Sequence, residues 1–262
     1  MGASIAFEAG LNKYRRNEYI LLSYHVHIPL PDPMTNPATL ARQNFYNVHS
    51  SPSYFVDGEA SGGGGSADAA RTLFETKIDP MIAKHLDVAP EAAIDLTARA
   101  ANSTVKVKTT VSKVNSTSDK LRLQIALVEG HVRYSGENGT RFHDMVVRSM
   151  ASSPATGPAG NKPQADEAEA STGKPGIPLP TLGFALRPGQ GGTFEYTFDL
   201  AKAEADALAH LQDFETNTRK GEYSFRQKKH EIDPSKLSVV AFVQDEATHK
   251  ILQAAYIKLE GK

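Results

Sequence analysis

The chain has 262 residues, of which 40% are hydrophobic and 23% charged, and its formal net charge is −1. These values are typical of a globular protein of one or two domains, and they exclude a wholly disordered, collagen-like or coiled-coil chain. A net charge near zero provides no overall basic field, so we expect no nucleic-acid partner. No stretch reaches the ~20 apolar residues of a membrane span, and none is expected.

Cysteine is absent from the sequence. The chain therefore forms no disulfide, holds no thiolate metal site and has no thiol nucleophile. Its first ten residues show no basic segment followed by an apolar one, so they do not resemble a signal peptide. The localisation stays open between the cell envelope or periplasm, if a signal lies upstream, and the cytoplasm.

The first 88 residues are predicted to alternate helices and strands. The run YILLSYHVHI is rich in β-forming residues and has apolar side chains on both faces, which favours a buried strand. Proline inside a helical pattern interrupts it, so Pro80 should kink or restart the last helix, and Asp79 could serve as a new cap. The predicted elements, in chain order, are helix 4–14, strand 19–28, helix 37–46 capped by Thr35 or Asn36, strand 53–56, a glycine-rich loop at 62–65, and a helix from Ser66 to Leu86.

From Ala92 onward apolar and polar residues alternate with period two, which predicts strands with one buried face. The expected strands are 94–99, 105–111, 121–127, 130–135, 141–149, 193–198, 237–244 and 250–259, and Asp199 should cap a helix at 200–216. Many such strands indicate an antiparallel β-sandwich. A segment rich in Gly and Pro at 151–181 is predicted to be a flexible surface loop. The expected fold is α+β, with domains at 1–88 and 89–262.

The residues Ser50-Ser51-Pro52-Ser53, leading into Tyr54-Phe55-Val56, match the place where thioredoxin-like folds carry a proline, normally cis, before a strand. The stretches YHVHIPLPDPMTNPATLAR, ALVEGHVRYSGENGTRFHDMVVR and LSVVAFVQDEATHKILQAA are similar to parts of a bacterial subgroup that joins such a domain to a C-terminal β-sandwich. The chain therefore resembles that subgroup over nearly its whole length. The resemblance implies a relationship to thiol–disulfide oxidoreductases.

One departure from this family concerns its chemistry. In the family a strand ending in Cys-x-x-Cys precedes the first helix, whereas here Met1-Gly2-Ala3-Ser4 stands just after that position and both cysteines are missing. Disulfide exchange requires an attacking thiolate. We therefore expect this chain to be inactive in that reaction, either as a fragment, as a misassigned start, or as a member that lost the chemistry.

Ser51, Pro52 and Ser53 are, through the resemblance, candidates for a remnant of a peptide-contact surface. In thioredoxin-like enzymes the residue before this proline pairs with the backbone of a bound peptide, so a protein or peptide could bind in a groove at Pro52. The alternative is a proline that only shapes the turn before a strand.

His25 and His27 are weak candidates for a metal site. Two residues apart on a strand, they would share one face, and such a pair can ligate zinc or copper with Asp32 or His49 as a third ligand. The spacing is unspecific, so histidines at the solvent edge are favoured and no metal or other cofactor is expected. A second group, His131, Arg133, Arg141, His143 and Arg148, could bind an acidic ligand across a hairpin, but a solvated polar face is favoured.

Two functions remain open. The first is an inactive relative of thiol–disulfide oxidoreductases. The second is a binding module of the bacterial envelope whose β-sandwich recognises a protein or a glycan while the first domain acts as scaffold. A metal-dependent hydrolase has almost no support, because no nucleophile–base arrangement can be found in the sequence.

Overall fold

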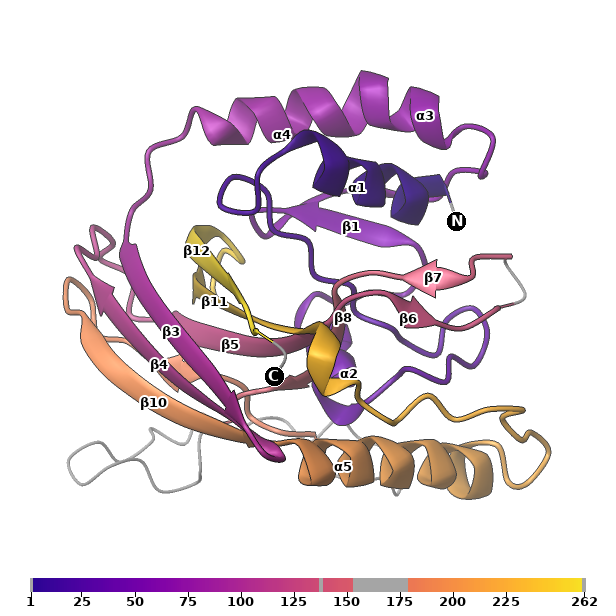
Figure 1. Cartoon of the computed structure of the whole chain (residues 1–262). Coiled ribbons are helices and arrows are strands. Elements are labelled where there is room, and N and C mark those ends of the chain that lie inside the picture. The colour runs from indigo at the N-terminus through magenta and orange to yellow at the C-terminus, as the bar shows by residue number, and fades with distance from the viewer. Residues whose placement is uncertain (1, 137–138, 153–178, 261–262) are drawn as a thin grey trace.

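The computed structural model describes residues 2–136, 139–152 and 179–260. It is a mixed α+β structure in which helices surround several antiparallel sheets (Figure 1). Most of the predicted loop at 151–181 lies outside the described residues. Within the described ranges, no helix combines the length and the apolar character that crossing a bilayer requires.

Helices α1 (Gly2–Lys13) and α2 (Pro37–Phe45) confirm the first two predicted helices. The cap of α2 is Asn36, whose side-chain oxygen accepts hydrogen bonds from the backbone N–H groups of Ala38 (3.1 Å) and Thr39 (3.2 Å). The Thr39 hydroxyl in turn accepts one from the Asn36 N–H, at 3.1 Å. This reciprocal arrangement satisfies donors that a helix start otherwise leaves unpaired.

The last helix of this part does not restart at Pro80. Helix α3 (Ala70–Leu73) continues through a π-helical stretch (Phe74–Ile78) into α4 (Asp79–Leu86), as the top of Figure 1 shows. A π-helical stretch shifts the hydrogen-bond ladder, which lets a proline follow without ending the helix. Asp79 is no cap either: its carboxylate accepts hydrogen bonds from Lys13 Nζ (2.5 Å) and from the Tyr14 hydroxyl (2.6 Å).

The predicted strand at 19–28 is wrong. Of these residues, all of which the structure describes, only Ser23 makes a β-bridge, and its partner is Val146. The side chains of Ile20, Leu21, Leu22 and Tyr24 pack, partly buried, against the sheet that contains Val146, without the run forming a strand. The strands described in the first 88 residues are β1 (Ser53–Val56), as predicted, and β2 (Glu59–Gly63), which pair as a hairpin. A thioredoxin-like domain is not confirmed.

Most of the strands predicted from alternation lie in two sheets that share one core, whereas residues of the predicted strands 130–135 and 141–149 also form a separate two-stranded sheet. One sheet has the order β10 (Gly192–Asp199), β4 (Thr104–Ser112), β3 (Ala93–Ala101). The other has the order β12 (Ile251–Lys258), β11 (Leu237–Asp245), β5 (Leu121–Glu129), β8 (Val146–Met150), with β9 (Phe184–Ala185) also paired to β5. Helix α5 (Leu200–Asp213) follows β10, capped by Asp199 as predicted.

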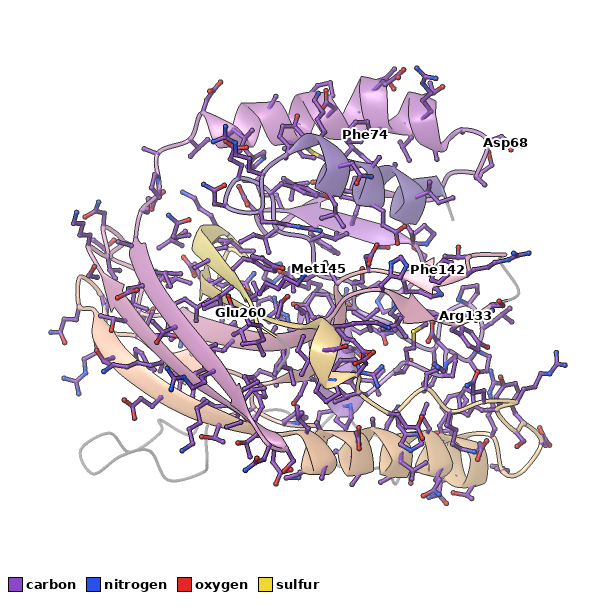
Figure 2. The ribbon with its side chains drawn as sticks, viewed as in Figure 1. Asp68, Phe74, Arg133, Phe142, Met145 and Glu260 are labelled. Atoms are coloured by element: carbon purple, nitrogen blue, oxygen red, sulfur yellow. The ribbon has the colours of Figure 1, made fainter. Side chains whose placement is uncertain are left out.

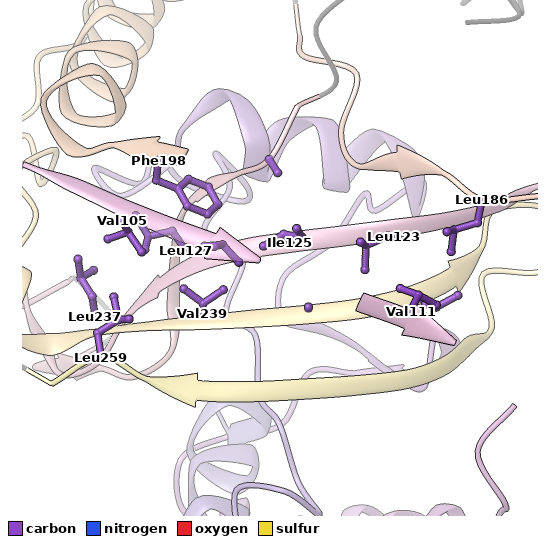
Figure 3. Close-up of a cluster of buried hydrophobic side chains, with 14 of the residues drawn as sticks. Val105, Val111, Leu123, Ile125, Leu127, Leu186, Phe198, Leu237, Val239 and Leu259 are labelled. Carbon is purple, nitrogen blue, oxygen red and sulfur yellow. The ribbon is translucent and has the colours of Figure 1, made fainter. Parts of the chain in front are cut away.

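The main hydrophobic core lies between these sheets. Leu123, Ile125 and Leu127 of β5 belong to one buried cluster with Val105 of β4 and Phe198 of β10, and Figure 3 shows these side chains between the strands. The intervening residues of β5 and β11 face the other way, and a second cluster covers them with side chains from the first 88 residues. The predicted boundary at residues 88 and 89 falls between α4 and β3, and it stays a prediction.

Candidate functional site

The Ser51–Pro52 peptide bond is cis. The Pro52 carbonyl accepts a hydrogen bond from the Gly64 N–H at 2.9 Å, and the Gly64 carbonyl accepts one from the Ala3 N–H at 3.2 Å. One glycine therefore joins the start of β1 to the start of α1. Ser51 is exposed and makes no hydrogen bond to any residue that the structure describes.

His25 and His27 do not share a strand face, because no strand forms there. His25 Nδ1 lies 2.7 Å from Asp32 Oδ2, and its ring meets that of His143 edge-on, with the centroids 5.1 Å apart. His27 points instead toward α5, where its Nε2 lies 3.1 Å from His210 Nε2. His49 is exposed. Among residues 2–136, 139–152 and 179–260, no three His, Asp or Glu side chains are grouped so as to hold a metal ion.

The hydrogen bonds of His27 define its protonation. Its Nδ1 accepts from the Asp32 N–H at 3.1 Å, so the neutral ring carries its proton on Nε2 and donates it to His210. Burial, followed by the nearby His210, lowers the pKa of His27 to about 3. Burial also lowers the pKa of His210. The pair is therefore uncharged near neutral pH, which removes the repulsion that two imidazolium rings would have.

The structure does not gather the second group of basic side chains on one surface; the group comprises His131, Arg133, Arg141, His143 and Arg148. Strands β6 (Val132–Arg133) and β7 (Phe142–His143) form the expected hairpin, where His131 stacks on Phe142 with centroids 4.6 Å apart. Arg133 and Arg141 are exposed, whereas His143 turns inward, 3.1 Å from the Tyr134 carbonyl. Arg148 is no part of a solvated face: its side chain is 3% exposed and its Nε lies 3.3 Å from Glu129 Oε2.

A pocket that was not predicted from the sequence lies between α1 and the segment before β8. Its cavity volume is about 370 Å³. The lining side chains are those of Ile5, Glu8, Ala9, Leu11, Asn12, Arg16 and Asp144. Helical spacing from Ile5 to Asn12 would have indicated one common face. Only the tertiary structure brings Asp144 to that face.

The pocket holds charges of both signs. Burial, and after it the charge of Asp144, raises the pKa of Glu8, while a hydrogen bond from the Asp144 backbone and the charges of His25 and His131 oppose the rise. Arg16 Nη1 is buried and has no hydrogen-bond partner among the described residues. Buried hydrogen-bond donors in native proteins normally have a partner. A shifted pKa beside a cavity is common at functional sites.

No protein-family model matches the chain, and no curated protein matches it in sequence. Among solved structures, a domain of the outer membrane lipoprotein Omp28 from Porphyromonas gingivalis is similar to it, with a TM-score of 0.30 and 12% sequence identity. The match covers 66% of this chain and 91% of the other. A similarity this low does not establish a shared fold.

Proposed function

We propose that this chain is a binding module of the bacterial envelope that contacts an extended peptide segment of a partner protein through Ser51, Pro52 and Ser53. The observation that carries this proposal is the exposed Ser51, whose backbone groups are unpaired next to a cis proline. Extended peptides bind by pairing with such free backbone groups. The envelope location belongs to the second of the two functions that the sequence left open.

The chain's own chemistry supports binding rather than catalysis at this place. Thiol–disulfide exchange passes through a mixed disulfide, which a chain without cysteine cannot form. A bound segment would instead lie beside β1, which has β2 as its only strand partner among the described residues. An edge strand leaves backbone donors and acceptors available to a further strand.

The β-sandwich enters this proposal as scaffold. On the outer face of β4 and β10, polar side chains contact one another: Lys108 Nζ lies 3.8 Å from Glu195 Oε1, and the Thr110 and Thr193 hydroxyls are 3.0 Å apart. Arg99 and Lys106, which lie opposite each other on this face, are exposed and have no ion pair among the described residues. We place the contact at Ser51 because of its unpaired backbone groups, not because the sandwich lacks free charges.

The proposal can be tested by titrating ¹⁵N-labelled protein with the alkylated insulin B chain, an unfolded peptide without free thiols. We expect amide shifts at Ser51, Ser53 and Gly64. Ser51→Pro removes the backbone donor and should weaken binding by roughly fivefold, the value of one hydrogen bond. Ser51→Ala keeps the backbone and should bind like the wild type. Shifts confined to other surfaces, or unchanged binding by a folded Ser51→Pro variant, would refute this function.

A further inference from the structure

Strand β10 forms one edge of the β10-β4-β3 sheet and takes no part in the proposed contact at Ser51. It lies at the margin of the molecule in Figures 1 and 2, and its side chains that face away from the core are exposed. All eight of its residues pair with β4 without a shift in register. The strand is therefore a long and regular edge.

The backbone groups of every second residue of β10 face the free edge. The Leu200 N–H donates to the Ser103 carbonyl at 2.8 Å, and this pair continues the register in which β10 lies against β4. In an antiparallel ladder, hydrogen-bonded pairs alternate with pairs that are not bonded. Counting back by twos from Leu200, the aromatic residues of β10 bond to β4. The residues between them, Thr193, Glu195 and Thr197, turn their N–H and C=O groups outward, and these groups have no hydrogen-bond partner among the described residues.

This edge lacks the features that usually prevent an edge strand from pairing with another chain, such as a lysine, a proline, a bulge or a covering element. The sequence of β10, GTFEYTFD, contains no lysine and no proline, and no bulge interrupts its pairing with β4. The edges on the other side of the sandwich differ, because β3 lies beside β12 and the pairing of β12 with β11 has a register shift. The edge of β10 can therefore accept a further strand.

The inner face of β10 adds apolar surface at the same edge. Phe194 and Tyr196 are only partly buried, although they pack against the main core. Phe184 of β9 lies beside both, with ring centroids 5.4 Å and 6.2 Å away. A strand added to β10 would cover these rings, and buried aromatic surface contributes strongly to the stability of interfaces.

The residue pattern of β10 is complementary to a second copy of itself. When two such edges pair antiparallel about a two-fold axis perpendicular to the sheet, residues directly opposite each other share a face. With Tyr196 opposite the same residue of the second copy, Phe194 lies opposite Phe198. In this register Glu195 lies opposite Thr197, whereas the register with Glu195 opposite Glu195 would bring two like charges together, which is unfavourable. We propose that the chain forms a symmetric dimer through β10, with a sheet that is continuous across the interface.

The dimer can be tested with the whole chain by sedimentation velocity over a series of concentrations, where we expect a reversible equilibrium between monomer and dimer. Thr197→Pro removes an N–H group that donates to no described residue, so the monomer should fold. The dimer should weaken at least about tenfold, because two symmetric hydrogen bonds are lost. Circular dichroism checks the fold. A chain that stays monomeric up to roughly 1 mM, or a folded Thr197→Pro variant that dimerises like the wild type, would overturn the proposal.

A second substitution keeps the proposal testable if Thr197→Pro does not fold, and it also identifies the register. Thr197→Lys would place an ammonium group opposite Glu195 of the second copy, and should strengthen the dimer roughly fivefold through two symmetric ion pairs. Thr97→Lys on β3 is the matched control, because Thr97 is exposed on the same face of the sheet. Each threonine lies opposite one lysine of β4, Thr197 opposite Lys106 and Thr97 opposite Lys108. A dimer that Thr197→Lys strengthens no more than Thr97→Lys does would overturn the proposal.

Discussion

The rings of His27 and His210 are in contact, and burial disfavours a positive charge on either ring. His27 also stacks on Phe214, with ring centroids 3.9 Å apart, so most of its surroundings are aromatic. The hydrogen bond that its Nδ1 accepts from the Asp32 N–H fixes the ring orientation. The contact links residues 25–32 to α5, and protonation of His27 at Nδ1 removes the hydrogen bond from the Asp32 N–H.

We predict that acid weakens the protein through His27. Between about pH 6.5 and pH 3 the unfolded chain binds a proton at this residue that the folded chain does not bind, so the unfolding free energy should fall as the pH falls. The loss attributable to His27 should be on the order of 4 kcal/mol over this range. Urea unfolding as a function of pH measures it. His27→Phe should flatten the dependence, whereas His49→Phe, at an exposed position, should not; equal curves for both variants would contradict the prediction.

Helix α2 is a short helix that is stabilised by tertiary contacts. It has only nine residues, and helices of that length are marginal without tertiary contacts. Besides capping the helix, Asn36 donates from its side chain to the Val147 carbonyl at 2.9 Å. Arg42, near the other end, donates to Gln244 Oε1 at 2.7 Å. Side chains at both ends of α2 are therefore hydrogen-bonded to the β12-β11-β5-β8 sheet.

We predict that Asn36→Ala lowers the unfolding free energy by ~1–3 kcal/mol, because it removes a cap and leaves a buried carbonyl without its donor. Ser66→Ala is the matched control: Ser66 is exposed and accepts a single 3.3 Å hydrogen bond from the Ala69 N–H. That substitution should cost less than ~0.5 kcal/mol. Urea denaturation of the two variants checks the difference. Similar losses would mean that the Asn36 contacts contribute little.

At the scale of the whole molecule, the sheet β12-β11-β5-β8 is buried on both faces. One face meets the β10-β4-β3 sheet, and the other meets residues from the first 88 positions. This explains why every residue of β11 is buried, where a sheet with one solvated face would alternate. Val128, Val240 and Phe242 form part of the face that the first 88 residues cover.

We predict that a chain consisting of residues 89–262 alone is less stable than the full chain and self-associates, because this apolar face would meet water. The full chain is the reference, and sedimentation velocity together with thermal unfolding measures both. A monomeric fragment with the thermal midpoint of the full chain would contradict the prediction. It would also mean that the proposed domain at 89–262 folds on its own.

The sequence by itself determined those elements whose pattern is local. Asn36 and Asp199 are the residues that cap the starts of α2 and α5. The alternation of apolar and polar residues from Ala92 onward predicts the long strands, because successive side chains of a strand point to opposite faces. The absence of cysteine likewise settled that this chain performs no thiol chemistry. For the caps and the strands, the residues that determine the structure lie within a few positions of one another in the sequence.

The tertiary structure decided the rest. The run at 19–28 is apolar enough for a strand, but its side chains at 20–24 pack against the face of the β12-β11-β5-β8 sheet, and its backbone meets the edge strand β8 only at Ser23, so it forms one bridge. His25 and His27, neighbours in the sequence, therefore point to different elements, β7 and α5. The pocket joins Glu8 to Asp144, which are more than half of the chain apart in the sequence. Local propensity contains no information about such contacts, because packing between distant segments determines which apolar and charged groups meet.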